Sequence, residues 1–235
     1  MNTEKLTSPT AIIVAGILIA GAVVISGSGQ QSTSDTKKGI AQQIGGINET
    51  KLQACIASNT YANKITSGTE SGDRAMAHLP EGQRGTPYNV LINSAGVKVE
   101  MAGALPYDDF KKAIDSLVAG TAKDQTNINL DPVTADDHVY GNRNAPIKLV
   151  EYGDMECPFC AQAYPTFKKL VDESNGQVAW VYRNYPLSIH ANAQVKAEAA
   201  ECAWAQGGDP VFFTYVEKLY DLVLPEKPAF DTTTL

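Results

Sequence analysis

Residues 147–160 read IKLVEYGDMECPFC, in which a short apolar segment runs directly into two cysteines separated by two residues. The first six residues predict a strand, and the residues after the first cysteine predict a helix. Cys157 then lies at a helix start, where unpaired N–H groups and the helix dipole lower the pKa of a thiol. A thiolate of this kind attacks a disulfide, and a second thiol resolves the mixed disulfide. We therefore expect Cys157 to be an exposed nucleophile and Cys160 to be a buried resolving thiol.

Half of a zinc site is the alternative interpretation of this C-x-x-C pair. Zinc requires two further ligands at a compatible spacing. The chain contains three histidines, and it has neither a second C-x-x-C nor an H-x₃-H pattern. We therefore favour redox chemistry over a metal site, and we expect no metal and no organic cofactor, because the active-site disulfide carries the electrons.

The charge of the chain argues against a nucleic-acid partner. Its 235 residues include 19 basic and 26 acidic side chains, which gives a formal net charge of −7. Binding to phosphates requires a clustered basic face, which an acidic chain of this kind does not predict. Hydrophobic residues make up 43% of the chain and charged residues 19%, so it is neither a disordered tail nor a polytopic membrane protein.

The N-terminal segment predicts export. Residues 6–34 contain no charged side chain, and residues 11–25 (AIIVAGILIAGAVVI) are all apolar or glycine. About 20 such residues span a bilayer as a helix, so residues 1–28 are expected to form a membrane anchor. A cleaved signal peptide is the main alternative, and a buried soluble helix is a weaker one. Either leading alternative places the rest of the chain outside the cytoplasm, behind a polar tether at residues 29–38.

Helix and strand patterns follow one another after the tether. Residues 88–93 (YNVLIN) and 97–101 predict a hairpin, and residues 177–185 (QVAWVYRNY) predict a further strand. Residues 68–85 are loop-rich with one short helix, and residues 120–145 are polar and irregular, as in a linker. Helices other than the one after Cys157 are expected at residues 48–58, 106–119, 193–206 and 210–222.

The surroundings of the C-x-x-C pair resemble those of a known family. The matching segments are residues 148–160 (KLVEYGDMECPFC), 182–187 (YRNYPL), 190–193 (HANA) and 199–203 (AAECA). Together they resemble the N-terminal half of DsbA-like thioredoxin-fold proteins. Residues 85–87 (GTP), the hairpin and residues 103–117 resemble the C-terminal half of the same family. The resemblance implies an α/β, thioredoxin-like fold with a helical insertion over roughly residues 39–235.

The two halves occur in the reverse of the family's order. Residues 39–119 correspond to the C-terminal half, residues 120–145 to a linker and lead-in, and residues 146–235 to the N-terminal half. The chain therefore resembles a circular permutant whose new termini lie inside the helical insertion, an arrangement tolerated where chain ends are close and exposed. Two alternatives remain: a domain-swapped dimer in which the halves are completed by a second copy, or two remnants that never form one domain.

The resemblance also implies roles for residues near the cysteines. Thr86 and Pro87 match the cis-proline segment whose backbone pairs with the substrate strand in thioredoxin folds. Glu151 matches a buried acid that manages protons as the resolving cysteine ionises. Phe159 stands where DsbA itself has histidine, and an exposed Phe159 would add an apolar contact for unfolded substrates. The missing positive charge argues against a very strongly oxidising potential.

Cys55 and Cys202 are the two cysteines left over, and each lies on an expected helix of the insertion. In an oxidising compartment such thiols tend to pair, so we predict a structural disulfide between them. The alternative is a pair of buried thiols that pack as small apolar side chains.

The sequence therefore predicts an exported, membrane-anchored thiol–disulfide oxidoreductase. Its expected substrates are cysteine-containing secreted proteins, and the resemblance implies a redox partner in the membrane. A reductase or isomerase of the same fold is one alternative, because it shares the same motif. A non-enzymatic metal-binding or metal-delivery module that uses the same thiols is the other. The protein would act as a monomer or as a domain-swapped dimer.

Overall fold

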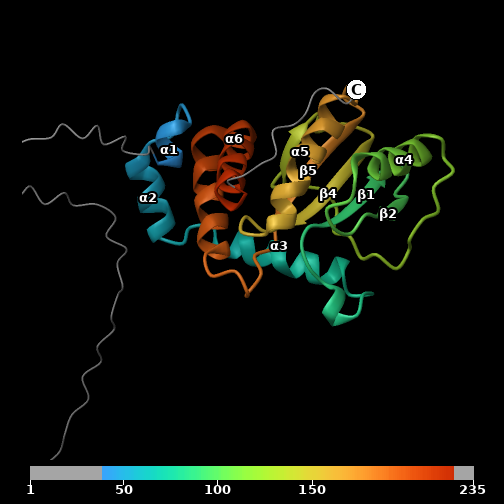
Figure 1. Ribbon diagram of the computed structural model, residues 1–235, viewed down its shortest axis with the longest axis horizontal. Helices are drawn as coiled ribbons and strands as arrows, with labels where there is room; N and C mark the ends of the chain where they lie inside the picture. The colour runs from blue at the N-terminus through green and yellow to red at the C-terminus, as the bar shows by residue number, and fades with distance from the viewer. Residues whose placement is uncertain (1–38, 225–235) are drawn as a thin grey trace, which may run out of the picture. The chain divides into compact units, whose positions relative to one another are not determined.

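The computed structural model describes residues 39–224, which form an α/β domain around one mixed sheet (Figure 1). The predicted anchor and tether, and the last residues of the chain, lie outside the described residues. None of the helices between residues 39 and 224 is long and apolar enough to span a bilayer. The elements are α1 (Ile40–Gln43), α2 (Glu49–Ala57), α3 (Ala62–Ala75), a 3₁₀ turn (Glu81–Gln83), β1 (Tyr88–Asn93), β2 (Lys98–Glu100), α4 (Tyr107–Val118), β3 (His138–Gly141), β4 (Ile147–Gly153), α5 (Pro158–Asp172), β5 (Val178–Asn184) and α6 (Ala193–Val223).

The sheet has the strand order β2-β1-β4-β5-β3. Strands β4 and β5 are parallel, whereas β1 pairs antiparallel with β4 and β3 pairs antiparallel with β5. Strand β1 precedes β4 by more than 50 residues, yet all six of its residues pair with β4. The segment around Pro87 and the segment around Cys157 therefore meet at one end of the sheet, within a single chain.

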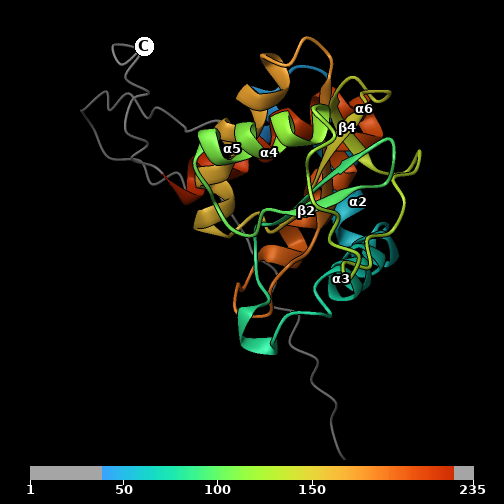
Figure 2. The same ribbon diagram turned by 90° about the vertical axis from the view of Figure 1, so that its right-hand side faces the viewer.

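Helices cover both faces of the sheet. Alternation along β4 places Leu149 on the face covered by α4 and α5, and Val150 on the opposite face, where α3 packs. Figure 2 shows α4 and α5 on one side of the strands and α3 on the other. Trp180 of β5 is fully buried under α5, in contact with the rings of Tyr164 and Phe167. This aromatic layer forms the floor beneath the C-x-x-C helix.

Helix α3 is the main difference between the expected and the observed elements. Residues 68–75, which the sequence assigned mainly to a loop, belong to this 14-residue helix. Its two glycines are explained by close packing rather than by a turn. A Cβ atom at Gly68 would lie 2.6 Å from the carbonyl oxygen of Asn184, and one at Gly72 would lie 2.4 Å from the Tyr185 ring. The glycines therefore allow the helix to approach β5 and the residue that follows it.

The linker differs from the expectation, whereas the last two helices agree with it. Residues 120–145 are not wholly irregular, because they contain β3, which becomes an edge strand of the sheet. The two helices expected at 193–206 and 210–222 are confirmed: α6 consists of two helical segments that meet at a kink, where Gly208 has non-helical geometry (φ 68°, ψ −162°). A positive φ is readily adopted by glycine, so the break lies where the sequence placed the boundary.

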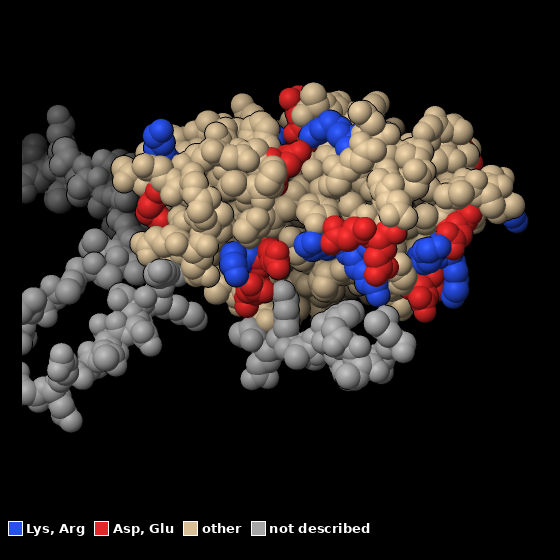
Figure 3. Space-filling view, turned by 90° about the horizontal axis from the view of Figure 1, so that it is seen from above, with Lys and Arg blue, Asp and Glu red and all other residues tan. Residues whose placement is uncertain are grey.

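Charged side chains of opposite sign lie beside one another on the face shown in Figure 3. Two of the pairs in the described chain are Lys168 with Asp172 and Arg74 with Asp131. Exposed pairs of this kind contribute little to stability individually. On that face, the described residues do not form a continuous basic surface.

Candidate redox site

The two cysteines lie where β4 turns into α5. Cys157 is the N-cap residue of α5 and Pro158 is its first residue, a position where the missing N–H of proline costs little. The Cys157 backbone N–H donates to the Asp154 carbonyl oxygen at 3.1 Å, which closes the turn between strand and helix. The Asp154 N–H points at the Cys160 sulfur, 3.5 Å away. Both thiols are free, and the turn holds them side by side at the helix start.

Cys160 is fully buried, in agreement with its expected position beneath the surface. The expectation of an exposed Cys157 is wrong, because only 3% of this residue is accessible. The reason is a contact that a local motif cannot reveal. The segment that ends at Pro87 lies over the cysteine, and the Cys157 thiol donates to the Thr86 carbonyl oxygen at 3.4 Å.

The peptide bond between Thr86 and Pro87 is cis. This bond directly precedes β1, and its carbonyl side faces Cys157 across a sequence separation of 71 residues. Pro87 itself is buried, whereas Thr86 is partly exposed. The structure therefore brings Thr86, Pro87 and both cysteines into one site.

The environment separates the two thiols in acidity. A hydrogen bond from the Cys160 thiol lowers the pKa of Cys157 to about 6, helped by Thr86 and by backbone N–H groups of the first turn of α5, and opposed by burial. Burial raises the pKa of Cys160, and the adjacent Cys157 and Glu151 act in the same direction. At neutral pH the reduced pair therefore holds one thiolate, on Cys157, and one thiol, on Cys160.

Glu151 lies on β4 beneath the cysteines and is 1% exposed. Its Oε2 accepts a hydrogen bond of 2.9 Å from the indole N–H of Trp180. Burial raises the pKa of Glu151 to about 8, against the effect of that hydrogen bond, and the nearby Cys157 adds to the increase. A carboxyl group with this pKa is protonated at neutral pH and is close to releasing its proton.

Asp154 is a buried residue of the site that the sequence did not single out. Its Oδ2 accepts hydrogen bonds from the Leu187 N–H and from Nδ1 of His190, both at 2.8 Å. Its Oδ1 accepts from the Glu156 N–H at 2.7 Å. Asp154 therefore joins the cysteine turn to the loop after β5. An aspartate directly between a strand and a C-x-x-C pair is the sequence signal that could have identified it.

Phe159, between the two cysteines, is 58% exposed. A large apolar side chain at this exposure is placed to contact a bound polypeptide beside the Cys157 sulfur. This arrangement agrees with the exposed position considered for it from the sequence, and its role in substrate binding stays a prediction.

Cys55 and Cys202 are joined by a disulfide across a sequence separation of 147 residues. Cys55 lies on α2 and Cys202 on α6, and their Cα atoms are 5.9 Å apart. The bond ties α2, the second helix of the described chain, to its last helix, at a location separate from the C-x-x-C turn. This confirms the disulfide that was predicted from the sequence.

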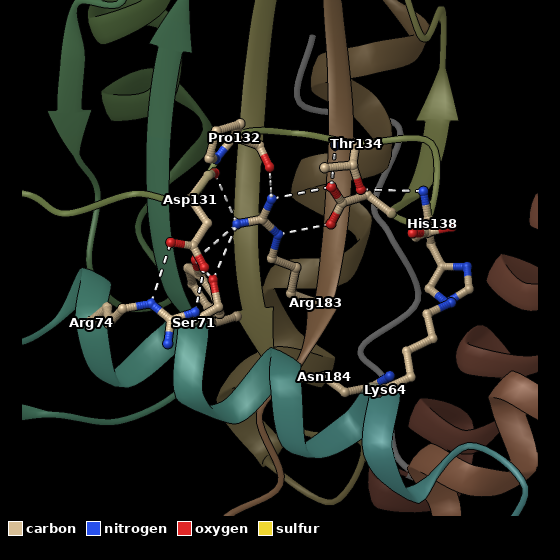
Figure 4. Close-up of polar contacts among 12 residues, drawn as sticks. Lys64, Ser71, Arg74, Asp131, Pro132, Thr134, His138, Arg183 and Asn184 are labelled. Atoms are coloured by element: carbon tan, nitrogen blue, oxygen red, sulfur yellow. Dashed lines mark hydrogen bonds and ion pairs between the residues drawn. The ribbon is translucent and has the colours of Figure 1, made fainter.

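Arg183, which the sequence analysis did not single out, holds the linker before β3 in place (Figure 4). The Arg183 guanidinium of β5 donates from Nε to Oδ1 of Asp137 at 2.8 Å and from Nη2 to the Pro132 carbonyl at 2.9 Å. It also donates from Nη1 to the hydroxyl of Tyr152 at 3.0 Å. Arg183 thus uses its donors to hold the linker against the sheet, so we assign it a structural role.

Comparison with known proteins identifies part of this domain. Residues 133–223, which include both cysteines of the C-x-x-C pair, match the family model described as Thioredoxin. The fold is thioredoxin-like. A crystal structure of Pseudomonas aeruginosa DsbA2 is 37% identical over the matched part, which covers 37% of this chain and 48% of that chain, with a TM-score of 0.34.

Curated relatives match a similar share of this chain. The Na(+)/H(+) antiporter NhaA 1 of Salinispora arenicola is 50% identical over 78 residues, which cover 32% of this chain and 12% of the antiporter. The NhaA 1 antiporter of Mycolicibacterium vanbaalenii is 39% identical over 94 residues, or 39% of this chain and 15% of the antiporter. The chain thus spans only about an eighth of the length of the first of these relatives.

Proposed function

We propose that this protein is a thiol–disulfide oxidoreductase that uses Cys157 and Cys160 as its redox pair. The observation that carries the proposal is the contact between the Cys157 sulfur and the Thr86 carbonyl, directly before a cis-proline. It places an acidified thiol beside a backbone segment that an extended substrate can pair with. The match of residues 133–223 to the Thioredoxin family supports the same activity.

In the oxidising direction, a substrate thiolate attacks the Cys157 sulfur of the Cys157–Cys160 disulfide. The S–S bond breaks and Cys160 leaves as a buried thiolate, which takes a proton from Glu151. A second substrate thiolate then attacks the substrate sulfur of the mixed disulfide, and Cys157 leaves as a thiolate. Two electrons pass from the substrate to the cysteine pair. A leaving thiol of low pKa departs faster, so the pKa of about 6 at Cys157 favours this last step.

In the reducing direction the same residues act in reverse order. The Cys157 thiolate attacks a substrate disulfide, and Cys160 then attacks the Cys157 sulfur of the mixed disulfide. Glu151 first releases its own proton to solvent, and its carboxylate then takes the proton of Cys160 as this thiol becomes a nucleophile. The direction depends on the reduction potential of the pair relative to that of its compartment. The proposed substrates are cysteine-containing secreted proteins, reached by export and anchoring through residues 1–28, with a redox partner in the membrane.

We further propose that the domain is a circular permutant of the DsbA-like arrangement. The pairing of β1 with β4 inside one chain supports it, because the segment with the cis-proline precedes the segment with the cysteines. Light scattering of residues 30–235 tests this proposal. We expect a monomer at all concentrations. A dimer that persists on dilution would instead indicate that a second copy completes the fold.

A metal-delivery role for the C-x-x-C pair has less support. Among residues 39–224, the cysteines at 157 and 160 do not belong to any cluster of three potential metal-ligating groups. Structural zinc sites use four ligands, and catalytic ones use three with a water.

The reduction potential of the Cys157–Cys160 pair is the experiment that tests the function. The protein is equilibrated with glutathione or dithiothreitol buffers, and disulfide exchange with a reduced, unfolded test protein is followed in parallel. We expect the wild type to catalyse the exchange and the Cys157→Ser variant to react no faster than the buffer. Equal rates for the two proteins would show that the proposed function is wrong.

A further inference from the structure

Glu198 is a buried carboxylate for which the redox mechanism has no use. It lies on α6, one helical turn before Cys202, and only 2% of it is accessible. Its Oε1 accepts a hydrogen bond of 2.7 Å from the Tyr61 N–H. Its Oε2 has no hydrogen-bond partner among the described residues. A buried carboxylate oxygen without a partner is costly, so it calls for an explanation.

The Glu198 carboxylate lies beside the second cysteine pair. One carboxylate oxygen of Glu198 and the sulfurs of Cys55 and Cys202 all lie within 4.8 Å of one another. These atoms come from two different helices, α2 and α6. In residues 39–224 this is the only cluster of three such groups.

The cluster is open to solvent on one side. Both sulfur-bearing residues line a hollow of about 500 Å³, together with Asn48, Lys51 and Gln206. Cys55 is half-buried, whereas Cys202 is 1% exposed. A small ion and a water molecule can therefore reach the sulfurs from this hollow, while Glu198 approaches from the buried side.

We propose that reduction of the Cys55–Cys202 disulfide converts this cluster into a zinc site with Cys55, Cys202 and Glu198 as ligands. Zinc is bound in proteins by thiolate, imidazole and carboxylate ligands, and three protein ligands with one water complete a tetrahedral site. With Zn–S bonds of about 2.3 Å, tetrahedral geometry requires the sulfurs to be about 3.8 Å apart. Breaking the disulfide leaves the two sulfurs free to separate to this distance by side-chain rotation.

The conversion consists of a reduction step followed by a zinc-binding step. An external dithiol supplies two electrons and two protons to the Cys55–Cys202 bond and becomes a disulfide. Zinc then binds the two sulfurs as thiolates and releases their two protons to solvent, while the Glu198 carboxylate supplies the third bond. Two thiolates and a carboxylate around Zn²⁺ give a net charge of −1, which the adjacent Lys51 offsets. The Tyr61 N–H fixes the orientation of the Glu198 carboxylate, as hydrogen bonds around metal ligands commonly do.

Cobalt(II) titration of the Cys157→Ser/Cys160→Ser protein tests the proposal, because this background removes the other thiol pair. The protein is reduced with dithiothreitol, desalted without oxygen and titrated with cobalt and then with zinc. We expect one cobalt per reduced chain, with thiolate-to-cobalt charge-transfer bands and tetrahedral visible bands that zinc abolishes. The oxidised protein is expected to show neither signal. Absence of the bands in the reduced protein, or the same bands in the oxidised protein, would overturn the proposal.

Glu198→Gln separates a designed site from binding by two cysteines alone. Glutamine keeps the oxygen that accepts from Tyr61 and loses the charged ligand, so we expect an at least tenfold weaker affinity for cobalt and zinc. Glu217→Gln, on the same helix and outside the cluster, is the matched control and is expected to bind as the parent protein does. Equal affinity in all three proteins would contradict the assignment of Glu198 as a ligand.

Thermal unfolding keeps the test decisive if reduction loosens the fold. A ligand that binds the folded state raises the unfolding temperature. We therefore expect zinc to raise the unfolding temperature of the reduced parent protein and of Glu217→Gln more than that of Glu198→Gln. If the reduced chain is unfolded without metal, zinc is expected to restore its far-ultraviolet circular dichroism. Failure of zinc to do either would overturn the proposal, and the redox function of Cys157 does not depend on the outcome.

Discussion

The two cysteine pairs differ in almost every structural respect. Cys157 and Cys160 are three residues apart, free, and placed at the start of one helix. Cys55 and Cys202 are 147 residues apart, bonded to each other, and placed on two helices. The first pair lies against a backbone carbonyl and above a carboxyl group with a raised pKa. The comparison shows that the surroundings of a cysteine pair, rather than the presence of two sulfurs, determine whether it exchanges electrons readily.

Replacing each cysteine pair with serine is expected to give the largest difference, which is a difference in catalysis of disulfide exchange. We expect the Cys157→Ser/Cys160→Ser variant to lose catalysis of disulfide exchange completely, because no other described thiol is free. The Cys55→Ser/Cys202→Ser variant is expected to keep catalysis within about threefold at temperatures where it is folded. Initial rates with a reduced, unfolded test protein measure both. Loss of activity in the second variant while it remains folded would show that the division of roles is wrong.

For the free energy of unfolding we expect the opposite contrast, with the larger effect in the Cys55→Ser/Cys202→Ser variant. A cross-link that closes a loop of 147 residues stabilises a protein by about 5 kcal/mol in the chain-entropy model, and measured values are commonly about 2–4 kcal/mol. The Cys55→Ser/Cys202→Ser variant should therefore lose about 2–5 kcal/mol of unfolding free energy in urea. The reference is the wild type in which Cys157 and Cys160 are free thiols and the Cys55–Cys202 bond is intact. A loss below about 1 kcal/mol would show that the Cys55–Cys202 disulfide does not have the structural role predicted for it.

Glu151, which lies beneath the active cysteine pair, is expected to make the stability of the fold depend on pH. Its folded-state pKa of about 8 lies above the ordinary 4.5, so the folded protein binds more protons between these pH values. The carboxyl group therefore stabilises the fold least at high pH, and its contribution falls by about 3 kcal/mol from pH 5 to pH 8. Glutamine does not titrate, and its carbonyl can accept from Trp180.

Urea unfolding at pH 5 and pH 8 measures this effect. We expect the Glu151→Gln variant to gain stability relative to the wild type as the pH rises between these values. A difference that does not change with pH would mean that Glu151 is ionised in the folded protein, and its proposed role as a proton donor to Cys160 would fail.

A smaller effect is expected from removing the hydrogen bond between the two thiols of the active pair. This bond is the largest contribution that lowers the pKa of Cys157 to about 6. In the Cys160→Ala variant we therefore expect the pH midpoint for alkylation of Cys157 to move upward, which slows the reaction at pH 6. Rates with iodoacetamide across pH 4–9 measure it, and Cys55 and Cys202 do not react while they remain bonded. An unchanged midpoint would show that another contact acidifies Cys157.

The sequence predicted those parts of the site that depend on local patterns. The strand before Cys157, the helix after it and the hairpin after Pro87 follow from short-range periodicity, and their resemblance to one family indicated that they meet. The burial of Cys157 could not be foreseen in the same way. It results from Thr86, which is 71 residues away in the sequence and reaches the sulfur only after β1 pairs with β4.

The elements that the sequence missed depend on tertiary packing. Gly68 and Gly72 lower helix propensity, yet they let α3 lie against Asn184 and Tyr185, so packing outweighs propensity there. Strand β3 is only four residues long and carries a histidine that stacks on Phe212 at 3.7 Å, a contact between distant segments. Asp154 was missed because its partners, the Leu187 N–H and His190, lie beyond the next strand.

Trapping of the mixed disulfide shows directly whether Cys157 is the nucleophile of the redox pair. The Cys160→Ala variant cannot resolve a mixed disulfide at Cys157, so a peptide with one activated disulfide should remain attached there. After brief incubation at pH 7, non-reducing peptide mapping by mass spectrometry identifies the modified residue. We predict one peptide per chain, bound to Cys157, with Cys55 still bonded to Cys202. A peptide bound to Cys55 or Cys202, or none bound at all, would show that Cys157 is not the nucleophile.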